Sequence, residues 1–475
     1  MGKSYPFWLD VAPLAITAVI LGIQFFVFKD FTPHIPLVIG ICITGLFMFI
    51  KGQKWADMEE HLLKVMKIGL PAILILMCVG MLIGTWIVAG TVPTIVYYGL
   101  KALTPSTFLA TACVLCSLVS LATGTSWGTL GTVGLAVMGI GEALGIPIYW
   151  TAGVVVSGSF FGDKMSPLSE TTQLTAAVTG INPWAHIKGM LPTTVPAIII
   201  TLIIYALIGM QYADSASQTE TSLLIQTTME SHFQLGWLTL LPAISVIYMG
   251  YKKYSAMGTI CVGVLLGALV AVFIQGAAVK DIFNILQNGY SSQTGVPYVD
   301  TLLSKGGVMS MTWVITLTLF SLGFVGALEI YGTFTAILKK INSLIKGRLS
   351  LVLVSYTSVL GVGTGLGDVY TSIVLPGRLM KDKYTQMGYK RTTLARSIED
   401  CGTLMSPLIP WNMGGGFVTA TLGIPTIVYA PFAIFCWLSP LIGILWAFTG
   451  WFIPREENVP ELMTAQEDDA PIDLT

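Results

Sequence analysis

Residues 158–173 read GSFFGDKMSPLSETTQ, and this stretch decides the fold because it places charged residues and a proline inside an apolar segment. A proline removes a hydrogen bond from a helix and leaves a backbone carbonyl free. Asp163 and Lys164 precede the proline, although a charge inside a membrane span costs at least about 2.5 kcal/mol. Charges at a proline break within apolar sequence are typical of a discontinuous helix that lines an ion path.

The composition of the whole chain favours a membrane protein. Of the 475 residues, 54% are apolar and only 10% are charged, whereas about a quarter are charged in soluble domains. This excludes a soluble globule, a disordered chain and a disulfide scaffold, and no basic region indicates a nucleic-acid partner. We expect a polytopic all-α protein in a lipid bilayer, whose hydrocarbon core is about 30 Å thick.

Ten apolar segments are long enough to be predicted as spans. Two further apolar stretches, 106–138 and 349–377, each carry a glycine-rich break, and each is too short for two crossings of about 20 residues. We expect both to be re-entrant hairpins, since broken backbone at membrane depth needs surrounding protein or a watery cavity. The predicted spans are 8–28, 35–50, 68–98, 151–180, 189–211, 236–250, 255–278, 312–338, 397–423 and 427–453.

Basic residues are distributed unequally between the loops, which predicts the orientation of the spans. If the loops rich in lysine and arginine lie in the cytoplasm, that side holds 19 of the 24 basic residues and the other side four. This arrangement requires 349–377 to return to its own side, because basic loops flank it at both ends. Both termini are then expected in the cytoplasm.

Three motifs recur in the same order at a nearly constant spacing of about 240 residues, which indicates an internal duplication. They are Gly90-Thr91 with Gly332-Thr333, Gly124-Thr125-x-x-Gly128 with Gly363-Thr364-x-x-Gly367, and Met165-Ser166-Pro167-Leu168 with Met405-Ser406-Pro407-Leu408.

The duplication predicts two halves, 1–225 and 226–454, followed by an acidic cytoplasmic tail at 455–475. Each half contains three spans, a hairpin, a broken span and a final span. Because five crossings is an odd number, the second half must be inserted upside down relative to the first. Inverted repeats with discontinuous helices are typical of secondary transporters, whose binding site lies at the repeat interface near the membrane midplane.

The two hairpin tips, TGTSWG at 123–128 and GTGLGD at 363–368, form the first candidate site. The free carbonyls of an incoming half-helix and nearby hydroxyls would suit a dehydrated Na⁺, whereas the free amides of the outgoing half-helix would suit a carboxylate. The alternative is a glycine hinge that serves packing alone. The candidate ligands at the tips are Thr125, Ser126, Thr364 and Asp368.

The two broken spans form the second candidate site. The second of them reads EDCGTLMSPLIPWN at 399–412 and repeats the Met-Ser-Pro-Leu motif of the first. Ionisable residues inside a membrane mark ion or proton paths, although an internal pair of Asp163 with Lys164 is the structural alternative. The candidates at the breaks are Asp163, Lys164, Ser166, Glu170, Thr171, Glu399, Asp400, Ser406 and Asn412.

Glu329 stands alone in the otherwise apolar segment 312–338. A buried, unpaired glutamate can carry a proton near neutral pH, so Glu329 joins Asp163, Lys164, Glu399 and Asp400 as a proton-coupling candidate. A fixed partner such as Lys164 is the alternative. The four histidines are dispersed and lie mostly in predicted loops, which argues against a histidine metal site.

The strings GTSWGTLGTVG at 124–134 and GSFFGDKMSPLSETTQ at 158–173 resemble the NhaC family of bacterial sodium/proton antiporters. The resemblance extends over most of the chain and implies a bacterial cytoplasmic-membrane protein in which hairpin tips and broken helices form the site. Homologues in that family include a sodium-lactate/malate-proton antiporter and amino-acid exchangers. The resemblance implies a site at Thr125, Ser126, Asp163, Ser166, Glu170 and Thr171, with Na⁺ held by Asp163, Ser166 and Thr125.

The favoured function is therefore exchange of Na⁺ for H⁺, with no cofactor beyond these ions. Exchange of a small organic anion or an amino acid, coupled to Na⁺ or H⁺, is the alternative, because Trp127, Trp411 and Asn412 could line a pocket larger than an ion needs. A channel is disfavoured because the repeat is internal, and an enzyme because no H-E-x-x-H motif occurs. The sequence leaves open whether the chain forms a homodimer.

Overall fold

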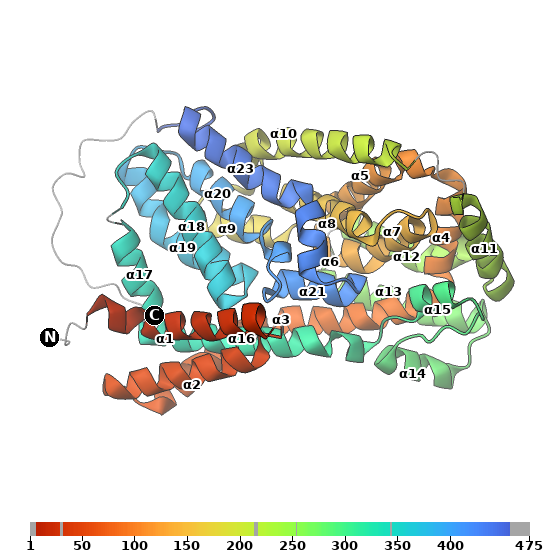
Figure 1. Cartoon of the computed structure of the whole chain (residues 1–475), viewed down its shortest axis with the longest axis horizontal. Helices are drawn as coiled ribbons and strands as arrows, with labels where there is room; N and C mark the ends of the chain where they lie inside the picture. The colour runs from red at the N-terminus through yellow and green to blue at the C-terminus, as the bar shows by residue number, and fades with distance from the viewer. Residues whose placement is uncertain (1–5, 29–31, 213–216, 253, 343, 457–475) are drawn as a thin grey trace.

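Among the residues that the computed structural model describes, the regular elements are helices, apart from one isolated β-bridge between Tyr389 and Arg455 (Figure 1). This confirms the expected fold class of an all-α protein with many apolar helices. The predicted tail at 455–475 lies outside the described residues from 457 onward. The structure describes residues 6–28, 32–212, 217–252, 254–342 and 344–456.

The first half begins with α1 and α2, which pack on each other, and with α3, which has 34 residues. α3 ends at Val88 because Gly90 adopts a left-handed φ of 75°, and α4 continues at an angle of 65° to it. The predicted span at 68–98 is therefore bent at Gly90, and Ile73–Val88 and Thr91–Ala102 together have the length and apolarity of one broken span. The elements are α1 (Phe7–Gly22), η1 (Ile23–Val27), α2 (His34–Ile50), α3 (Trp55–Val88), α4 (Thr91–Ala102), α5 (Pro105–Thr123), α6 (Ser126–Thr129), η2 (Leu130–Gly134), α7 (Leu135–Ala143), α8 (Ile148–Met165), α9 (Glu170–Thr179), α10 (Pro183–Met210) and α11 (Ser217–His232).

The second half breaks at the corresponding place. α16 ends at Tyr331 because Gly332 has a left-handed φ of 90°, so the helix that is long enough to span, Val308–Tyr331, ends before the predicted bound of 338. The elements are η3 (Trp237–Leu240), α12 (Leu241–Tyr251), α13 (Ala256–Phe273), α14 (Val279–Asn288), α15 (Pro297–Leu303), η4 (Val308–Met311), α16 (Thr312–Tyr331), α17 (Thr333–Asn342), α18 (Arg348–Leu366), α19 (Val369–Gln386), α20 (Arg391–Gly402), η5 (Ser406–Leu408), α21 (Met413–Leu422), α22 (Thr426–Tyr429), η6 (Ala430–Phe432) and α23 (Ile434–Thr449).

Each predicted hairpin turns at a left-handed glycine that is followed by a helix N-cap. Gly124 has a φ of 72° and precedes the N-cap Thr125, while Gly367 has a φ of 69° and precedes the N-cap Asp368. Gly363 lies inside α18. The predicted pairing of Gly124 with Gly363 is therefore wrong by four residues, because only glycine adopts the left-handed turn without strain.

Fewer uninterrupted helices than the ten predicted spans have the length and apolarity to cross a bilayer. Three described helices qualify, at Pro105–Thr123, Pro183–Met210 and Val308–Tyr331, and up to six do if each of three bent pairs counts as one span. The first of these, Pro105–Thr123, is the incoming helix of the first predicted hairpin. Because this helix is long enough to cross the bilayer, its length does not distinguish a re-entrant hairpin from a full span.

The packing places α3 and α16 against each other near the middle of the molecule. α2 packs on α16, whereas α13 packs on α3, so each of the two long helices is covered by a helix from the opposite half. Figure 1 shows α1 and α2 along one edge, with α5 and α8 between that edge and α10. The largest buried apolar cluster surrounds α5, α7 and α8.

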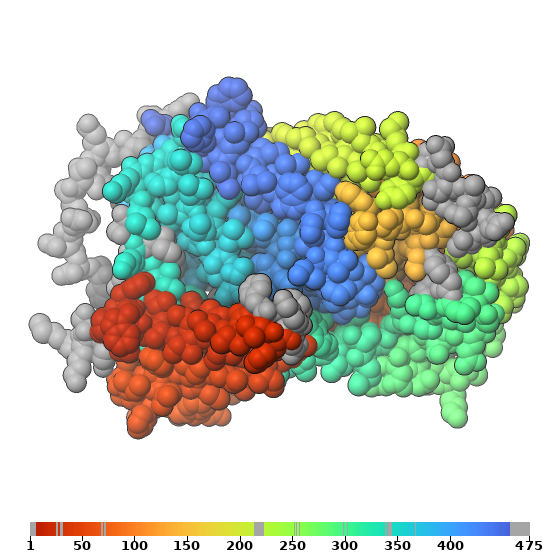
Figure 2. Space-filling view, in the orientation of Figure 1, coloured from red at the N-terminus to blue at the C-terminus, as the bar shows by residue number. Residues whose placement is uncertain are grey.

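Large apolar side chains cover the outside of the protein, as a lipid-facing surface requires. On α10 the residues Leu191, Val195, Ile199 and Ile203 recur every fourth position, and each is more than 40% exposed. Figure 2 shows α10 and α23 along one edge of this surface and α1 and α2 along the opposite edge. The exposed apolar stripe supports a multi-pass membrane protein.

Candidate functional site

Each hairpin tip is hydrogen-bonded to the broken helix of its own half. In the first half the Ser166 hydroxyl donates to the Leu121 carbonyl over 2.9 Å. In the second half the Met413 N–H donates to the Gly367 carbonyl over 2.7 Å, and the indole N–H of Trp411 donates to Thr364 over 2.6 Å. Each predicted hairpin tip therefore contacts the helix break that follows it in the chain, and each such pair is called a tip-and-break unit below.

Asp163 is held at the centre of the first unit. Its carboxylate is 4% exposed and accepts a hydrogen bond of 2.6 Å from the hydroxyl of Ser126, which lies just after the tip. Asp163 is the third residue from the end of α8, which stops at Met165 because Pro167 follows. No basic side chain pairs with Asp163 among the described residues, which leaves a buried carboxylate available to a cation.

The other two predicted Na⁺ ligands lie near Asp163 without a hydrogen bond to it. Thr125 caps α6 by accepting from the Gly128 N–H, and its side chain also lines a cavity. The Ser166 hydroxyl faces the backbone of α5 and also accepts from the Leu168 N–H. The structure thus brings Asp163 and Ser126 into direct contact.

Glu399 lies in a second buried carboxylate centre, which joins the two halves. It accepts hydrogen bonds from Thr171 over 3.0 Å and Thr175 over 2.6 Å in the first half, and from Thr403 over 2.7 Å in its own half. The Nε2 atom of His186 lies 3.6 Å from its carboxylate, and both side chains are fully buried. This cluster of Glu399, Thr171, Thr175, Thr403 and His186 is called the Glu399 centre below.

Lys164 pairs with Asp400 and not with Asp163, so the alternative of an internal pair of adjacent residues is wrong. Successive helical residues point in different directions, and Lys164 reaches across to the second half, where it and Asp400 are both fully buried. Asp400 also accepts from Ser439 over 2.7 Å and Tyr356 over 3.1 Å. A buried charge of each sign is therefore neutralised inside the interface between the halves.

The polar side chains of the second tip hydrogen-bond mainly to nearby backbone groups. Asp368 is 3% exposed and caps α19 by accepting hydrogen bonds from both the N–H and the hydroxyl of Thr371. The Thr364 hydroxyl donates to the Leu360 carbonyl. The side-chain amide of Asn412 donates to Gly363 and accepts from Gly414, and Ser406 is buried beside Gly414.

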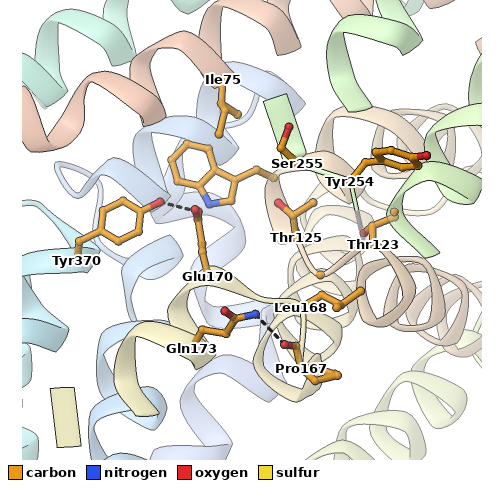
Figure 3. A pocket seen from close by; sticks show the side chains of 13 residues that line it. Ile75, Thr123, Thr125, Pro167, Leu168, Glu170, Gln173, Tyr254, Ser255 and Tyr370 are labelled. Carbon is orange, nitrogen blue, oxygen red and sulfur yellow. Dashed lines mark hydrogen bonds between the residues drawn. The ribbon is translucent and has the colours of Figure 1, made fainter. Parts of the chain in front are cut away.

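Glu170 begins α9 and faces a cavity of about 400 Å³. Its carboxylate accepts a hydrogen bond of 2.6 Å from the hydroxyl of Tyr370 on α19. Figure 3 shows this pair at one side of the cavity, with Thr123 and Tyr254 at the other. The remaining wall comes from Ile75, Gly124, Thr125, Trp127, Pro167, Leu168, Gln173, Gly250 and Ser255.

Glu329 is neither buried nor unpaired, and this corrects the sequence-based expectation. It lies in the last turn of α16, its side chain is 50% exposed, and its carboxylate lies 3.2 Å from Nε2 of His61. Glu329 is isolated from other charged residues in the sequence, but in the fold α3 places His61 beside it. The alternative partner, Lys164, is engaged by Asp400.

Three residues of the Glu399 centre and several of the cavity, Tyr370 among them, were missed by sequence reasoning. His186 was assigned to a loop because the predicted span began at 189, whereas α10 begins at Pro183 with Asn182 as its N-cap. Asparagine followed by proline is a helix-start signal and could have placed this histidine in the span. No local signal identifies Thr175, Thr403 and Tyr370, whose partners lie on other helices.

Comparison with known proteins shows the family to which the chain belongs. A model described as the Na⁺/H⁺ antiporter family matches residues 6–172 and 158–451. The chain is 38% identical over 456 residues to the Na⁺/H⁺ antiporter NhaC of Alkalihalophilus pseudofirmus, covering 94% of this chain and 98% of the relative.

Two other relatives have organic cargo in their names. The malate-2H⁺/Na⁺-lactate antiporter of Bacillus subtilis is 35% identical over 443 residues, which is 92% of this chain and 94% of that one. The arginine/ornithine antiporter ArcD of Halobacterium salinarum is 35% identical over 453 residues, which is 94% of this chain and 92% of that one. The family match and the near full-length identity confirm the resemblance found in the sequence: the chain belongs to the Na⁺/H⁺ antiporter family.

Proposed function

We propose that the chain is a secondary active antiporter that exchanges Na⁺ for H⁺ across the bacterial cytoplasmic membrane by alternating access. Membership of the antiporter family supports this function. The observation that carries it is Asp163, a buried carboxylate at a helix break that bonds to Ser126 and has no basic partner among the described residues. Such a group can hold either a proton or a dehydrated cation, but not both.

Competition at Asp163 would couple the two ions. When Na⁺ binds, it takes the carboxylate oxygens and the hydroxyl oxygens of Ser126, Thr125 and Ser166, and the proton leaves Asp163. When a proton returns to the carboxyl group, the negative charge that holds Na⁺ is lost and Na⁺ dissociates. Each ion shifts the inward–outward equilibrium only by its difference in affinity for the two states.

We propose the Glu399 centre as a second proton-coupling locus. Its three hydroxyl donors and His186 surround a carboxylate that bridges the halves. Any movement of one half against the other would change these distances and hence the proton affinity of Glu399. The pair of Lys164 and Asp400 and the second tip, with Thr364, Asp368, Ser406 and Asn412, are proposed to complete the site.

An inverted repeat with two re-entrant hairpins remains our proposal for the architecture. The left-handed Gly90 and Gly332 after α3 and α16, and the capped turns after Gly124 and Gly367, support it. The cavity borders the α12–α13 turn, which the basic residues assign to the cytoplasm. We therefore propose that the structure represents an inward-facing state with both termini in the cytoplasm.

Exchange of an organic solute is the second candidate, and the cavity favours it. A volume of about 400 Å³ equals roughly a dozen water molecules at about 30 Å³ each, far more than a dehydrated cation needs. Two relatives with organic cargo in their names support the same candidate. In both versions the coupling ions would use Asp163.

Proton movement in liposomes distinguishes these functions. Purified protein is reconstituted with a trapped pH dye, and Na⁺ or K⁺ is added outside, first alone and then with malate, lactate or amino acids. Na⁺ alone should move protons, and Asp163→Asn should abolish the signal. Asp281→Asn, an exposed acid on α14, is the matched control. Sodium-driven exchange that persists in Asp163→Asn would refute the assignment of this carboxylate.

A further inference from the structure

We infer that the cavity beside Glu170 binds a small solute that carries a protonated amino group. The inference rests on the proposed antiport function, since this solute would be its organic cargo, and it names the cargo's chemical class. The cavity is lined by α3, the first hairpin tip, the break before α9, the α12–α13 turn and α19. Segments from both halves of the chain therefore contribute to its wall.

The charge of the cavity selects a cation. Glu170 is the single ionisable side chain other than tyrosine among the described residues that line it, and it is exposed to the space. Tyr370 donates to one of its carboxylate oxygens but supplies no positive charge. Asp163 lies close enough for the charges of the two carboxylates to act on each other. An incoming anion would thus meet negative charge on this wall.

The buried lysine is not available to receive the carboxylate of a solute in the cavity. Lys164 is fully buried, does not line the cavity, and donates to Asp400 and Ser439. Freeing it would leave Asp400 as an uncompensated buried charge, which is strongly unfavourable. Among the described residues that line the cavity, none supplies a cation to balance the two charges of a solute such as malate.

Aromatic rings complete the recognition of an amine. Trp127, Tyr254 and Tyr370 all line the cavity. The ring of Trp127 packs on Phe417 with 4.4 Å between centroids, so one face is covered and a solute can use the other. Ammonium groups are attracted to the faces of such rings within about 6 Å. One carboxylate with several rings is suited to a protonated amine.

Hydroxyl groups on the opposite wall suit the rest of such a solute. Thr125 and Ser255 each accept a hydrogen bond from a backbone N–H, at Gly128 and Gly258. Because a hydroxyl also carries one proton, both can still donate to a polar group of the solute. The roughly 400 Å³ of space accommodates a short-chain amino acid or diamine and its remaining water.

Equilibrium binding to purified full-length protein in detergent tests the inference without requiring ion exchange. Radiolabelled lysine and putrescine are the amine probes and radiolabelled malate is the anion probe, in potassium phosphate free of Na⁺ and of amine buffers. The inference predicts saturable binding of both amines and none of malate. Glu170→Gln should weaken amine binding at least tenfold, whereas Glu60→Gln, an exposed glutamate of α3, should not.

A second variant keeps the test decisive if Glu170→Gln folds poorly. Gln173 lies one turn after Glu170 on α9 and lines the same cavity. Gln173→Lys would place a cation beside the carboxylate, and it should abolish amine binding while the protein stays monodisperse. Wild-type protein that binds malate but neither amine, or binds none of the three, overturns the inference. Amine binding that is unchanged in both variants also overturns it. Sodium-driven proton movement in liposomes would still stand in each case, so failure of the cargo assignment is distinguishable from failure of the antiport function.

Discussion

Replacing Asp400 by asparagine should destabilise the protein strongly, because it leaves Lys164 charged and unpaired inside the fold. Both side chains are fully buried, and breaking a buried pair by removing one partner typically costs about 3–5 kcal/mol. Ser439, Thr193 and Tyr356 hydrogen-bond to the carboxylate, and an asparagine oxygen can keep some of these bonds but not the charge. We expect Asp400→Asn to lose about 3–5 kcal/mol of unfolding free energy.

The reverse single variant should cost about as much. In Lys164→Met the Asp400 carboxylate keeps its three hydroxyl donors but loses the charge that balances it, so we again expect a loss of about 3–5 kcal/mol. The double variant removes both charges, and replacing a whole buried pair is often close to neutral.

Unfolding in mixed detergent micelles, followed by near-UV circular dichroism, measures all four proteins of this cycle. The unfolding free energy of the double variant should lie within about 1 kcal/mol of the wild-type value, since a whole buried pair is often replaceable. It should be well above that of Asp400→Asn. If the two single losses simply add in the double variant, Lys164 and Asp400 are not coupled and the reasoning is refuted.

Three further predictions concern the hairpin, an outer loop and the corrected glutamate. Gly124→Ala should destabilise by at least about 1–2 kcal/mol, because a left-handed residue with a side chain is strained and its Cβ would lie 2.5 Å from that of Leu168; thermal melting in detergent measures this. The Thr294 backbone N–H, with the Thr294 hydroxyl, lowers the pKa of Asp300 in α15. Such a group stabilises the fold above its unfolded pKa, and this stabilisation is lost as pH falls through the folded pKa. Hydrogen exchange in the segment before α15, 289–296, should therefore rise below about pH 4 in wild type and be fast at all pH values in Asp300→Asn. Glu329→Gln should cost less than about 1 kcal/mol, as exposed pairs do, and keep sodium-driven exchange; loss of exchange would restore Glu329 as a coupling group.

The breaks and turns were predictable because their causes are local. Pro167 ends α8 one turn after the charged residues, and the capped turns follow from glycine next to Thr125 or Asp368. The register between the two tips was wrong because Gly363 and Gly367 both belong to glycine-rich sequence. Only the backbone conformation identifies which of the two glycines turns the chain.

The pairing of the buried charges was not predictable, because it joins residues more than 200 positions apart. Adjacency in sequence suggested Asp163 with Lys164, yet the two side chains leave α8 in different directions and Lys164 meets Asp400. The same holds for His186 and Glu399, which come together only when α10 packs on α20. Sequence patterns identify which residues are unusual in a membrane, whereas the fold decides their partners.

Proton release on Na⁺ binding tests the shared carboxylate most directly. Purified protein in weakly buffered detergent solution is mixed with NaCl or KCl, and the pH is followed with a soluble dye. The account predicts acidification with Na⁺ that saturates, is absent with K⁺ at equal ionic strength, and disappears in Asp163→Asn but not in Asp281→Asn. Sodium that binds without releasing protons, or proton release that survives in Asp163→Asn, would contradict competition of the two ions at Asp163.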